Sequence, residues 1–235
     1  MCDIATLTLD VASVAKVEAA IRAAETAAGR PTGVVQLLAV SKTRSAAEVA
    51  SLHGAGVEDF GENYLQEALP KIRELADQGI TWHFIGAIQS NKTRDIARHF
   101  NWVHTLDRVR VADRLNAAAH RTLDVCLQVN VDAEPQKAGV APEETGALLA
   151  RVQQLHNLRA RGLMAIPKEA GGEATRESFR RLRRLFDDLA PIAGPSWDTL
   201  SMGMSGDFEV AVAEGSTLVR IGTALFGPRP PRTRR

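Results

Sequence analysis

The chain alternates between short apolar, β-branched runs and longer segments whose apolar positions recur every three or four residues. The short runs have the length and composition of strands, and the longer segments have the spacing of amphipathic helices. The strand-like runs cover residues 34–41, 58–61, 81–86, 102–106, 124–131, 158–166, 199–202 and 218–226. Repeated strand–helix units of this kind predict a parallel sheet.

Helical patterns lie between these runs and also before the first of them. They cover residues 10–28, 63–78, 108–120, 142–154 and 175–189. The first pattern meets stop signals at Gly29 and Pro31. Eight strand–helix units favour a single (β/α)8 TIM barrel of the α/β class, one domain over residues 1–235 with an extra N-terminal helix. An open doubly wound sheet satisfies the same local pattern, but the count favours the barrel.

The fifth run shows which face of a strand would line the barrel. Cys126, Gln128 and Asn130 share one face, whereas valine and leucine occupy the odd positions from 125 to 131. The apolar face is expected to meet the helices and the polar face to line the interior. In such a barrel, the loops at the carboxyl ends of the strands build the active site.

Composition narrows the class of protein. With 29 basic against 28 acidic groups, the net charge of +1 gives no overall field that would attract nucleic acid or a membrane. The sequence shows neither a signal-peptide pattern nor an apolar stretch of about 18 residues that could span a bilayer. Cys2 and Cys126 suit a reducing compartment, so we expect a cytoplasmic protein. The basic tail 228–235 is expected to be a disordered end rather than a nucleic-acid arm.

Lys42 is the lysine best placed for chemistry. It ends the string LLAVSK, and strand alternation puts it on the face of Leu38 and Val40, which points into the barrel. A lysine in a low-dielectric barrel mouth tends to a lowered pKa, which makes its amine available for imine formation with a carbonyl. The alternative is a lysine whose head extends past the strand end into solvent.

Arg220 interrupts the eighth run and is also expected to point inward. A buried guanidinium must find an acceptor, and one interpretation is a structural salt bridge to an interior carboxylate. The other is functional, because Arg is a recognised partner of the pyridine nitrogen in pyridoxal phosphate sites.

Two small-residue turns follow the last strands, where barrels often bind phosphate. Met204, Ser205 and Gly206 follow the seventh run, and Gly222 and Thr223 lie in the eighth. Glycine allows close approach of the backbone, and the hydroxyls donate hydrogen bonds. Ser205 could equally be the N-cap of a helix over residues 207–213.

Other polar residues carry weaker signals. Asn63 and Tyr64 follow the second run, and His83 in the third run is more typical of a hydrogen-bonded core histidine than of a catalyst. The histidines and cysteines lack metal-ligand spacing, and no P-loop or dinucleotide fingerprint is present. We therefore expect no metal and no nucleotide.

The strings LLAVSKT, FGENYLQE, WHFIGAIQSNK, RGLMAIP, LSMGMSGD and STLVRIGTALFG, in this order, resemble the YggS/PROSC family of pyridoxal phosphate homeostasis proteins over residues 35 to 227. The resemblance implies the barrel of the alanine racemase N-terminal domain and pyridoxal 5'-phosphate as cofactor. The cofactor residues that it implies are Lys42 for the Schiff base, Asn63 and Met204 near the cofactor, Ser205, Gly222 and Thr223 at the phosphate, and Arg220 at the pyridine nitrogen. The chain departs from the family at Gly206, where a polar residue is common, and around Lys137, which is expected to be an exposed loop lysine rather than a second acceptor or a lid residue.

A carrier role is expected rather than catalysis. An arginine stays protonated and would leave the pyridine nitrogen unprotonated, which weakens the cofactor as an electron sink. Racemases similar to this barrel take a second base, a tyrosine, from a second β-domain that this chain is expected to lack, and its one tyrosine is Tyr64. We therefore expect a monomer that acts in intracellular cofactor homeostasis and delivers pyridoxal phosphate to apoenzymes.

Two alternatives remain open at this point. The first is a low-rate pyridoxal phosphate-dependent amino-acid racemase or related enzyme, with Tyr64 or His83 supplying a proton. The second is a Schiff-base aldolase, in which Lys42 attacks a substrate carbonyl and the two turns hold a sugar phosphate.

Overall fold

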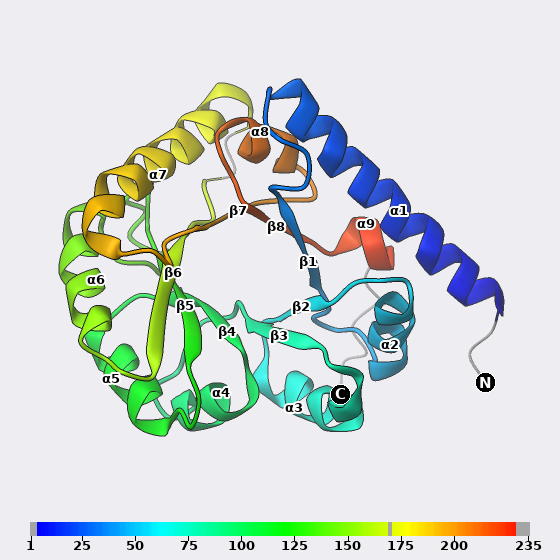
Figure 1. Cartoon of the computed structure of the whole chain (residues 1–235), viewed down its shortest axis with the longest axis horizontal. Helices are drawn as coiled ribbons and strands as arrows, with labels where there is room; N and C mark the ends of the chain where they lie inside the picture. Colours follow the sequence, from blue (N-terminus) through cyan, green and yellow to red (C-terminus); the bar gives the residue numbers. More distant parts are fainter. Residues whose placement is uncertain (1–3, 169–170, 229–235) are drawn as a thin grey trace.

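A computed structural model of the chain describes residues 4–168 and 171–228, without the side chains of residues 4–10. Eight parallel strands close into a barrel in sequence order, each paired with the next and the last with the first. They are β1 (Gln36–Val40), β2 (Asp59–Glu62), β3 (Thr81–Phe84), β4 (Trp102–Leu106), β5 (Leu123–Gln128), β6 (Leu158–Met164), β7 (Thr199–Met204) and β8 (Leu218–Ile221). The closed ring of Figure 1 confirms the predicted barrel and rules out the open sheet.

Helices surround the ring of strands (Figure 1). They are α1 (Ile4–Ala27), α2 (Ala46–Gly54), α3 (Leu65–Glu74), α4 (Thr93–His99), α5 (Val109–Ala118), α6 (Thr145–Gln153), α7 (Gly172–Ala193), α8 (Phe208–Ala213) and α9 (Thr223–Phe226), with 3-10 turns at Ala76–Gln78 and Pro142–Glu144. The predicted extra N-terminal helix is α1, which lies along the outside of the barrel against α2, α8 and α9.

The eighth predicted run was too long. Only residues 218–221 form a strand, because the pairing of β8 with β1 ends at Ile221 opposite Ala39. The chain then turns at Gly222 and continues as the short helix α9. Of the predicted tail 228–235, all but Pro228 lie outside the described residues.

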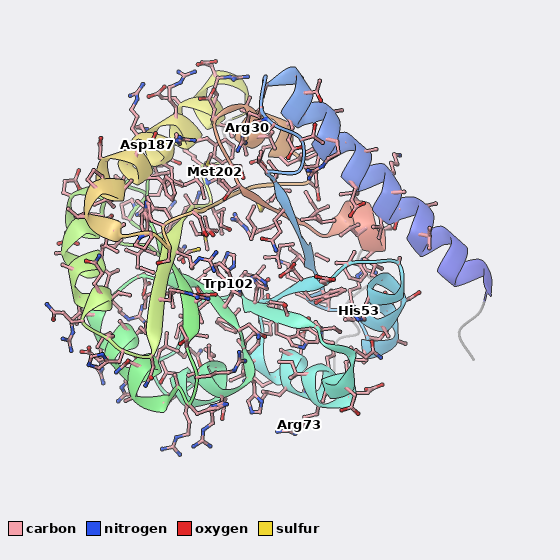
Figure 2. All side chains as sticks on the ribbon, viewed as in Figure 1. Arg30, His53, Arg73, Trp102, Asp187 and Met202 are labelled. Carbon is pink, nitrogen blue, oxygen red and sulfur yellow. The ribbon has the colours of Figure 1, made fainter. Side chains whose placement is uncertain are left out.

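The barrel interior is filled with side chains. Figure 2 places Trp102 inside the ring, whereas Arg73 and Asp187 lie on the outer helices. The large apolar core lies between the strands and the helices, and a small inner cluster joins Leu38 to residues of β8 and of the segment after β3. Val40 packs against this inner cluster, which confirms that the face shared by Leu38 and Val40 points into the barrel. In the described part of the chain, no helix combines the length and apolarity that crossing a membrane requires.

Candidate functional site

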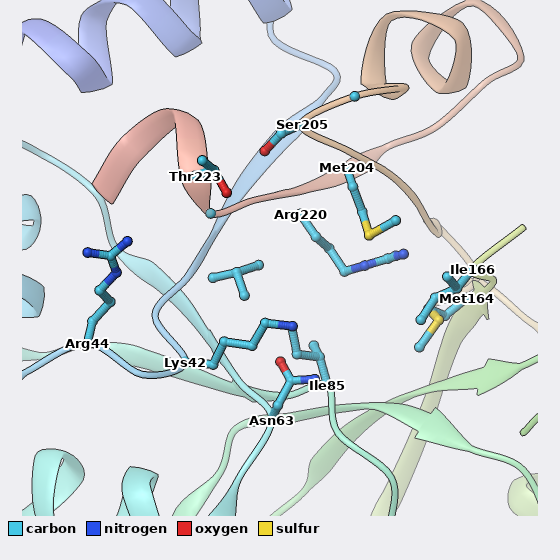
Figure 3. Close-up of a pocket in the computed structure, with 13 residues that line it drawn as sticks. Lys42, Arg44, Asn63, Ile85, Met164, Ile166, Met204, Ser205, Arg220 and Thr223 are labelled. Carbon is cyan, nitrogen blue, oxygen red and sulfur yellow. The ribbon is translucent and has the colours of Figure 1, made fainter. Parts of the chain in front are cut away.

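A cavity of about 260 Å³ opens at the carboxyl ends of the strands, and Figure 3 shows the side chains that line it. It brings together all seven residues that the sequence suggested for a cofactor site, from four strand ends. They are Lys42, Asn63, Met204, Ser205, Arg220, Gly222 and Thr223. Much of the remaining wall comes from residues that were not among these candidates, namely Arg44, Ile85, Met164 and Ile166.

Lys42 enters the cavity two residues after β1 ends. The preceding Ser41 turns outward and donates a hydrogen bond from Oγ to Glu62 Oε1 (2.6 Å), so Lys42 turns inward. Figure 3 shows the Lys42 side chain stretched across the cavity toward Asn63. Thr43 adopts a left-handed backbone conformation (φ 65°), and its N–H donates to Glu67 Oε2 (3.0 Å). The end of β1 is thus held on both sides of Lys42.

A buried ion pair supports this strand end from outside the barrel. Lys71 of α3 donates to the backbone oxygen of Ser41 (2.9 Å) and to Glu62 Oε1. Both side chains are almost completely buried, and burial raises the pKa of Glu62 although the positive charge of Lys71 opposes this. Glu62 Oε2 has no hydrogen-bond partner. The ammonium of Lys71, rather than solvent, is therefore what opposes the effect of burial on Glu62.

Arg220 is the buried cation of the site. Nη1 donates to the backbone oxygen of Ser201 (2.7 Å) and to its Oγ (2.9 Å), and Nη2 donates to the oxygen of Ala165 (3.0 Å). Within the described residues no carboxylate lies at ion-pair distance, so the alternative of a structural salt bridge is wrong. Burial lowers the pKa of Arg220 to about 10, so that the guanidinium remains protonated at neutral pH.

Asn63 presents a polar atom that the protein does not satisfy. Asn63 lines the cavity, and its Oδ1 is buried without a hydrogen-bond partner. A buried polar atom without a partner costs about 1–3 kcal/mol, so a donor on a bound group would be favoured here. The loop that carries Asn63 passes very close to Gly86, where an added Cβ would lie 2.0 Å from the Asn63 backbone oxygen. Gly86 is therefore required for this loop to reach the cavity.

The turn after β7 forms the opposite wall. Gly203 has φ 96°, and a Cβ there would lie 2.6 Å from Ala211 Cβ, so glycine lets the strand end pack on α8. Asp207 then accepts a hydrogen bond from the N–H of Met204 (2.6 Å) and is the N-cap of α8. The alternative of Ser205 as this N-cap is wrong, because the helix begins three residues later.

Two exposed hydroxyls, those of Ser205 and Thr223, lie across the cavity from Lys42 (Figure 3). The backbone at Gly222 lies close to β1, and a Cβ there would be in ordinary contact with Val40. At Gly206 an added Cβ would meet nothing within 4 Å. The departure from the family at Gly206 therefore does not reflect a lack of space.

Two residues that could have supplied protons lie elsewhere. Tyr64 is 50% exposed at the start of α3 and does not line this cavity. His83 is fully buried, with its ring nitrogens 2.8 Å from Asp59 Oδ1 and 2.9 Å from His104 Nε2, which confirms the prediction of a hydrogen-bonded core histidine.

Lys137 also lies outside the cavity. It donates to the backbone oxygen of Pro167 (3.0 Å) and pairs with Glu134, so it is a half-buried loop lysine rather than a fully exposed one. Across residues 4–168 and 171–228, no three His, Cys, Asp or Glu side chains are grouped so that they could hold a metal ion.

A family model shows which class of protein this barrel belongs to. The model of the family described as "Alanine racemase, N-terminal domain" matches residues 13–230, nearly the whole chain. The relatives then define the family within it. A pyridoxal phosphate homeostasis protein of Pseudomonas aeruginosa is 58% identical over 221 residues, which cover 92% of this chain and 94% of that protein. One from Escherichia coli is 47% identical over 225 residues, which cover 92% of this chain and 95% of that protein.

A solved structure agrees with these relatives. PipY of Synechococcus elongatus, determined with pyridoxal phosphate bound, is 38% identical with a TM-score of 0.81, and the match covers 93% of this chain and all of PipY. The chain therefore belongs to the family of pyridoxal phosphate homeostasis proteins, as its motifs indicated.

Proposed function

We propose that this protein binds pyridoxal 5'-phosphate in the cavity, holds its aldehyde as a Schiff base on Lys42, and acts in pyridoxal phosphate homeostasis and delivery. The observation that carries the proposal is the convergence of an inward lysine, an unpaired Asn63 oxygen and a buried arginine on one cavity. The homeostasis proteins and the loaded PipY structure support the choice of cofactor.

The residues present fit this cofactor. Lys42 supplies the amine, and the unpartnered Asn63 Oδ1 supplies an acceptor near it. Arg220 supplies a cationic donor suited to a pyridine nitrogen. The hydroxyls of Ser205 and Thr223 lie where a phosphate would need donors, at the ends of the last two strands.

The charge state of Arg220 favours a carrier over an enzyme. When bound, pyridoxal phosphate supplies an aldehyde that exchanges between amines and, in enzymes, a ring that withdraws electrons. Because Arg220 remains protonated at neutral pH, it donates a hydrogen bond and leaves a pyridine nitrogen without a proton. Neither Tyr64 nor His83 lines the cavity, so the structure gives the racemase alternative no second proton donor from these two residues.

The proposal extends to the setting in which the protein works. We place it in the cytoplasm as a monomer, with pyridoxal phosphate-dependent apoenzymes as recipients and with no nucleic acid or membrane as partner. The near-neutral net charge and the unpaired, buried Cys126 support this setting.

The test is a titration of cofactor-free protein with pyridoxal phosphate, followed by visible absorbance. Wild type and the control Lys16→Ala, an exposed lysine on α1, should develop the same imine band, and Lys42→Ala should not. An equal band in Lys42→Ala would overturn the site. Robust racemisation of free amino acids by the loaded protein would overturn the carrier role.

A further inference from the structure

A continuous chain of hydrogen-bonded side chains crosses the barrel interior beneath the cavity. From Arg220, the first link runs to Ser201 Oγ (2.9 Å), which lies 2.9 Å from His104 Nδ1. His104 Nε2 lies 2.9 Å from His83 Nδ1, and His83 Nε2 lies 2.8 Å from Asp59 Oδ1. Asp59 begins β2, so the chain connects the cavity with the amino-terminal end of the barrel.

The two ends fix the direction of every link. A carboxylate only accepts, so His83 must donate to Asp59 from Nε2, and a neutral His83 then accepts at Nδ1. His104 must therefore donate from Nε2 and accept at Nδ1, which directs the Ser201 hydroxyl proton toward His104. The Ser201 oxygen is left to accept from Arg220, which can only donate. All four hydrogen bonds thus point from the cation to the carboxylate.

The surroundings hold this arrangement in place. Burial lowers the pKa of His83 and of His104, so both rings are neutral at neutral pH. Trp102 stacks on the His83 ring with centroids 5.3 Å apart and planes 10° apart, which fixes the ring orientation.

Other nearby carboxylates are engaged elsewhere. Asp124, whose charge acts to raise the pKa of His83, forms ion pairs with Arg159 and Arg161. Asp207, whose charge acts to raise the pKa of Arg220, accepts a hydrogen bond from the backbone N–H of Met204. Asp59 is hydrogen-bonded to His83 and to Gln36, neither of which is a permanent cation.

We propose that Asp59 is a positioning residue for the cavity, which orients Arg220 from the far end of the barrel through His83, His104 and Ser201. Its effect on pyridoxal phosphate rests on the proposed function. Loss of the Ser201 hydroxyl or of the Asp59 carboxylate as acceptor should weaken cofactor binding about three- to tenfold, the range expected for one hydrogen bond.

The first arm of the test uses cofactor-free protein and nitrogen NMR of the histidine rings. Both His83 and His104 should be neutral, with the proton on Nε2. Asp59→Asn replaces an acceptor by an amide that can also donate, so the His104 signals should move although His104 is two hydrogen bonds away. Asp198→Asn is the matched control. It removes the same charge, beside the start of β7, but Asp198 takes no part in the series of hydrogen bonds from Arg220 to Asp59.

The second arm measures the dissociation constant of pyridoxal phosphate for the same variants. Asp59→Asn and Ser201→Ala should bind more weakly, and Asp198→Asn should bind like wild type. A proton on His104 Nδ1 in wild type overturns the proposal. Wild-type affinity for pyridoxal phosphate in both Asp59→Asn and Ser201→Ala overturns it as well. Ser201→Ala decides the second arm if Asp59→Asn does not fold. If wild type does not bind pyridoxal phosphate at all, the proposed function is overturned instead. The NMR arm then still decides the direction of the hydrogen bonds between Arg220 and Asp59.

Discussion

The ion pair behind Lys42 provides a quantitative test of how the strand end is held. Lys71→Met keeps most of the side-chain length but removes the ammonium that contacts Ser41 and Glu62. Glu62 is then left fully buried without a partner for its charge. Removing one member of a buried pair costs about 3–5 kcal/mol in the free energy of unfolding, and we expect a loss of about 3 kcal/mol here at neutral pH.

The loss should depend on pH with a definite sign. Burial already raises the pKa of Glu62 above its ordinary value of 4.5, and loss of Lys71 raises it further. Folded Glu62 then holds its proton more tightly than the unfolded chain does. Stability must therefore fall as the pH rises from the ordinary pKa of the unfolded chain to the raised pKa of folded Glu62. The deficit of Lys71→Met should be larger at about pH 8 than at about pH 5.

Urea unfolding of wild type, Lys71→Met, Glu62→Gln and the double variant measures this effect. The double variant should regain part of the lost stability and should lose the added pH dependence. Arg151→Met is the control, because its pair with Asp113 is exposed and should cost less than about 1 kcal/mol. Equal deficits of Lys71→Met at both pH values, or a loss no larger than that of the control, would refute the reasoning.

Two further predictions concern single positions. Gly203→Ala should destabilise the protein by about 2–4 kcal/mol in thermal or urea unfolding, because φ at this position is positive and the added Cβ would clash with Ala211. Gly206→Ala is the control and should change stability by less than about 1 kcal/mol. Equal effects of the two substitutions would contradict this description of the turn. Cys126 is completely buried, and burial raises the pKa of its thiol. A thiol reagent should therefore label Cys126 in urea but not in the native protein, as peptide mass spectrometry would show. Rapid labelling of Cys126 in the native protein would contradict this placement.

The barrel could be predicted from sequence because each strand run carries its own signal. Alternation placed Leu38, Val40 and Lys42 on one face, and the structure agrees for the two apolar residues through their shared inner cluster. The end of the eighth run could not be predicted in this way, since residues 223–226 are as apolar as a strand. Only the end of pairing with β1 shows that they form α9.

Site residues could be predicted from the sequence where a motif marks the end of a strand. They could not be predicted where their contacts form only when the barrel closes. The partners of Arg220 come from β7 and from the segment after β6, so no local pattern reveals Ser201 or Ala165. Ile85 and Met164 line the cavity as ordinary apolar residues and carry no chemical signal. Such residues become visible only when the eight strand ends meet.

The central claim, that Lys42 holds the cofactor, can be tested by locating the bond itself. Protein loaded with pyridoxal phosphate is reduced with borohydride, digested and analysed by mass spectrometry. We expect one pyridoxyl label, on the peptide that contains Lys42. A label on Lys71 or Lys137, or labels spread over several lysines with none dominant, would contradict it.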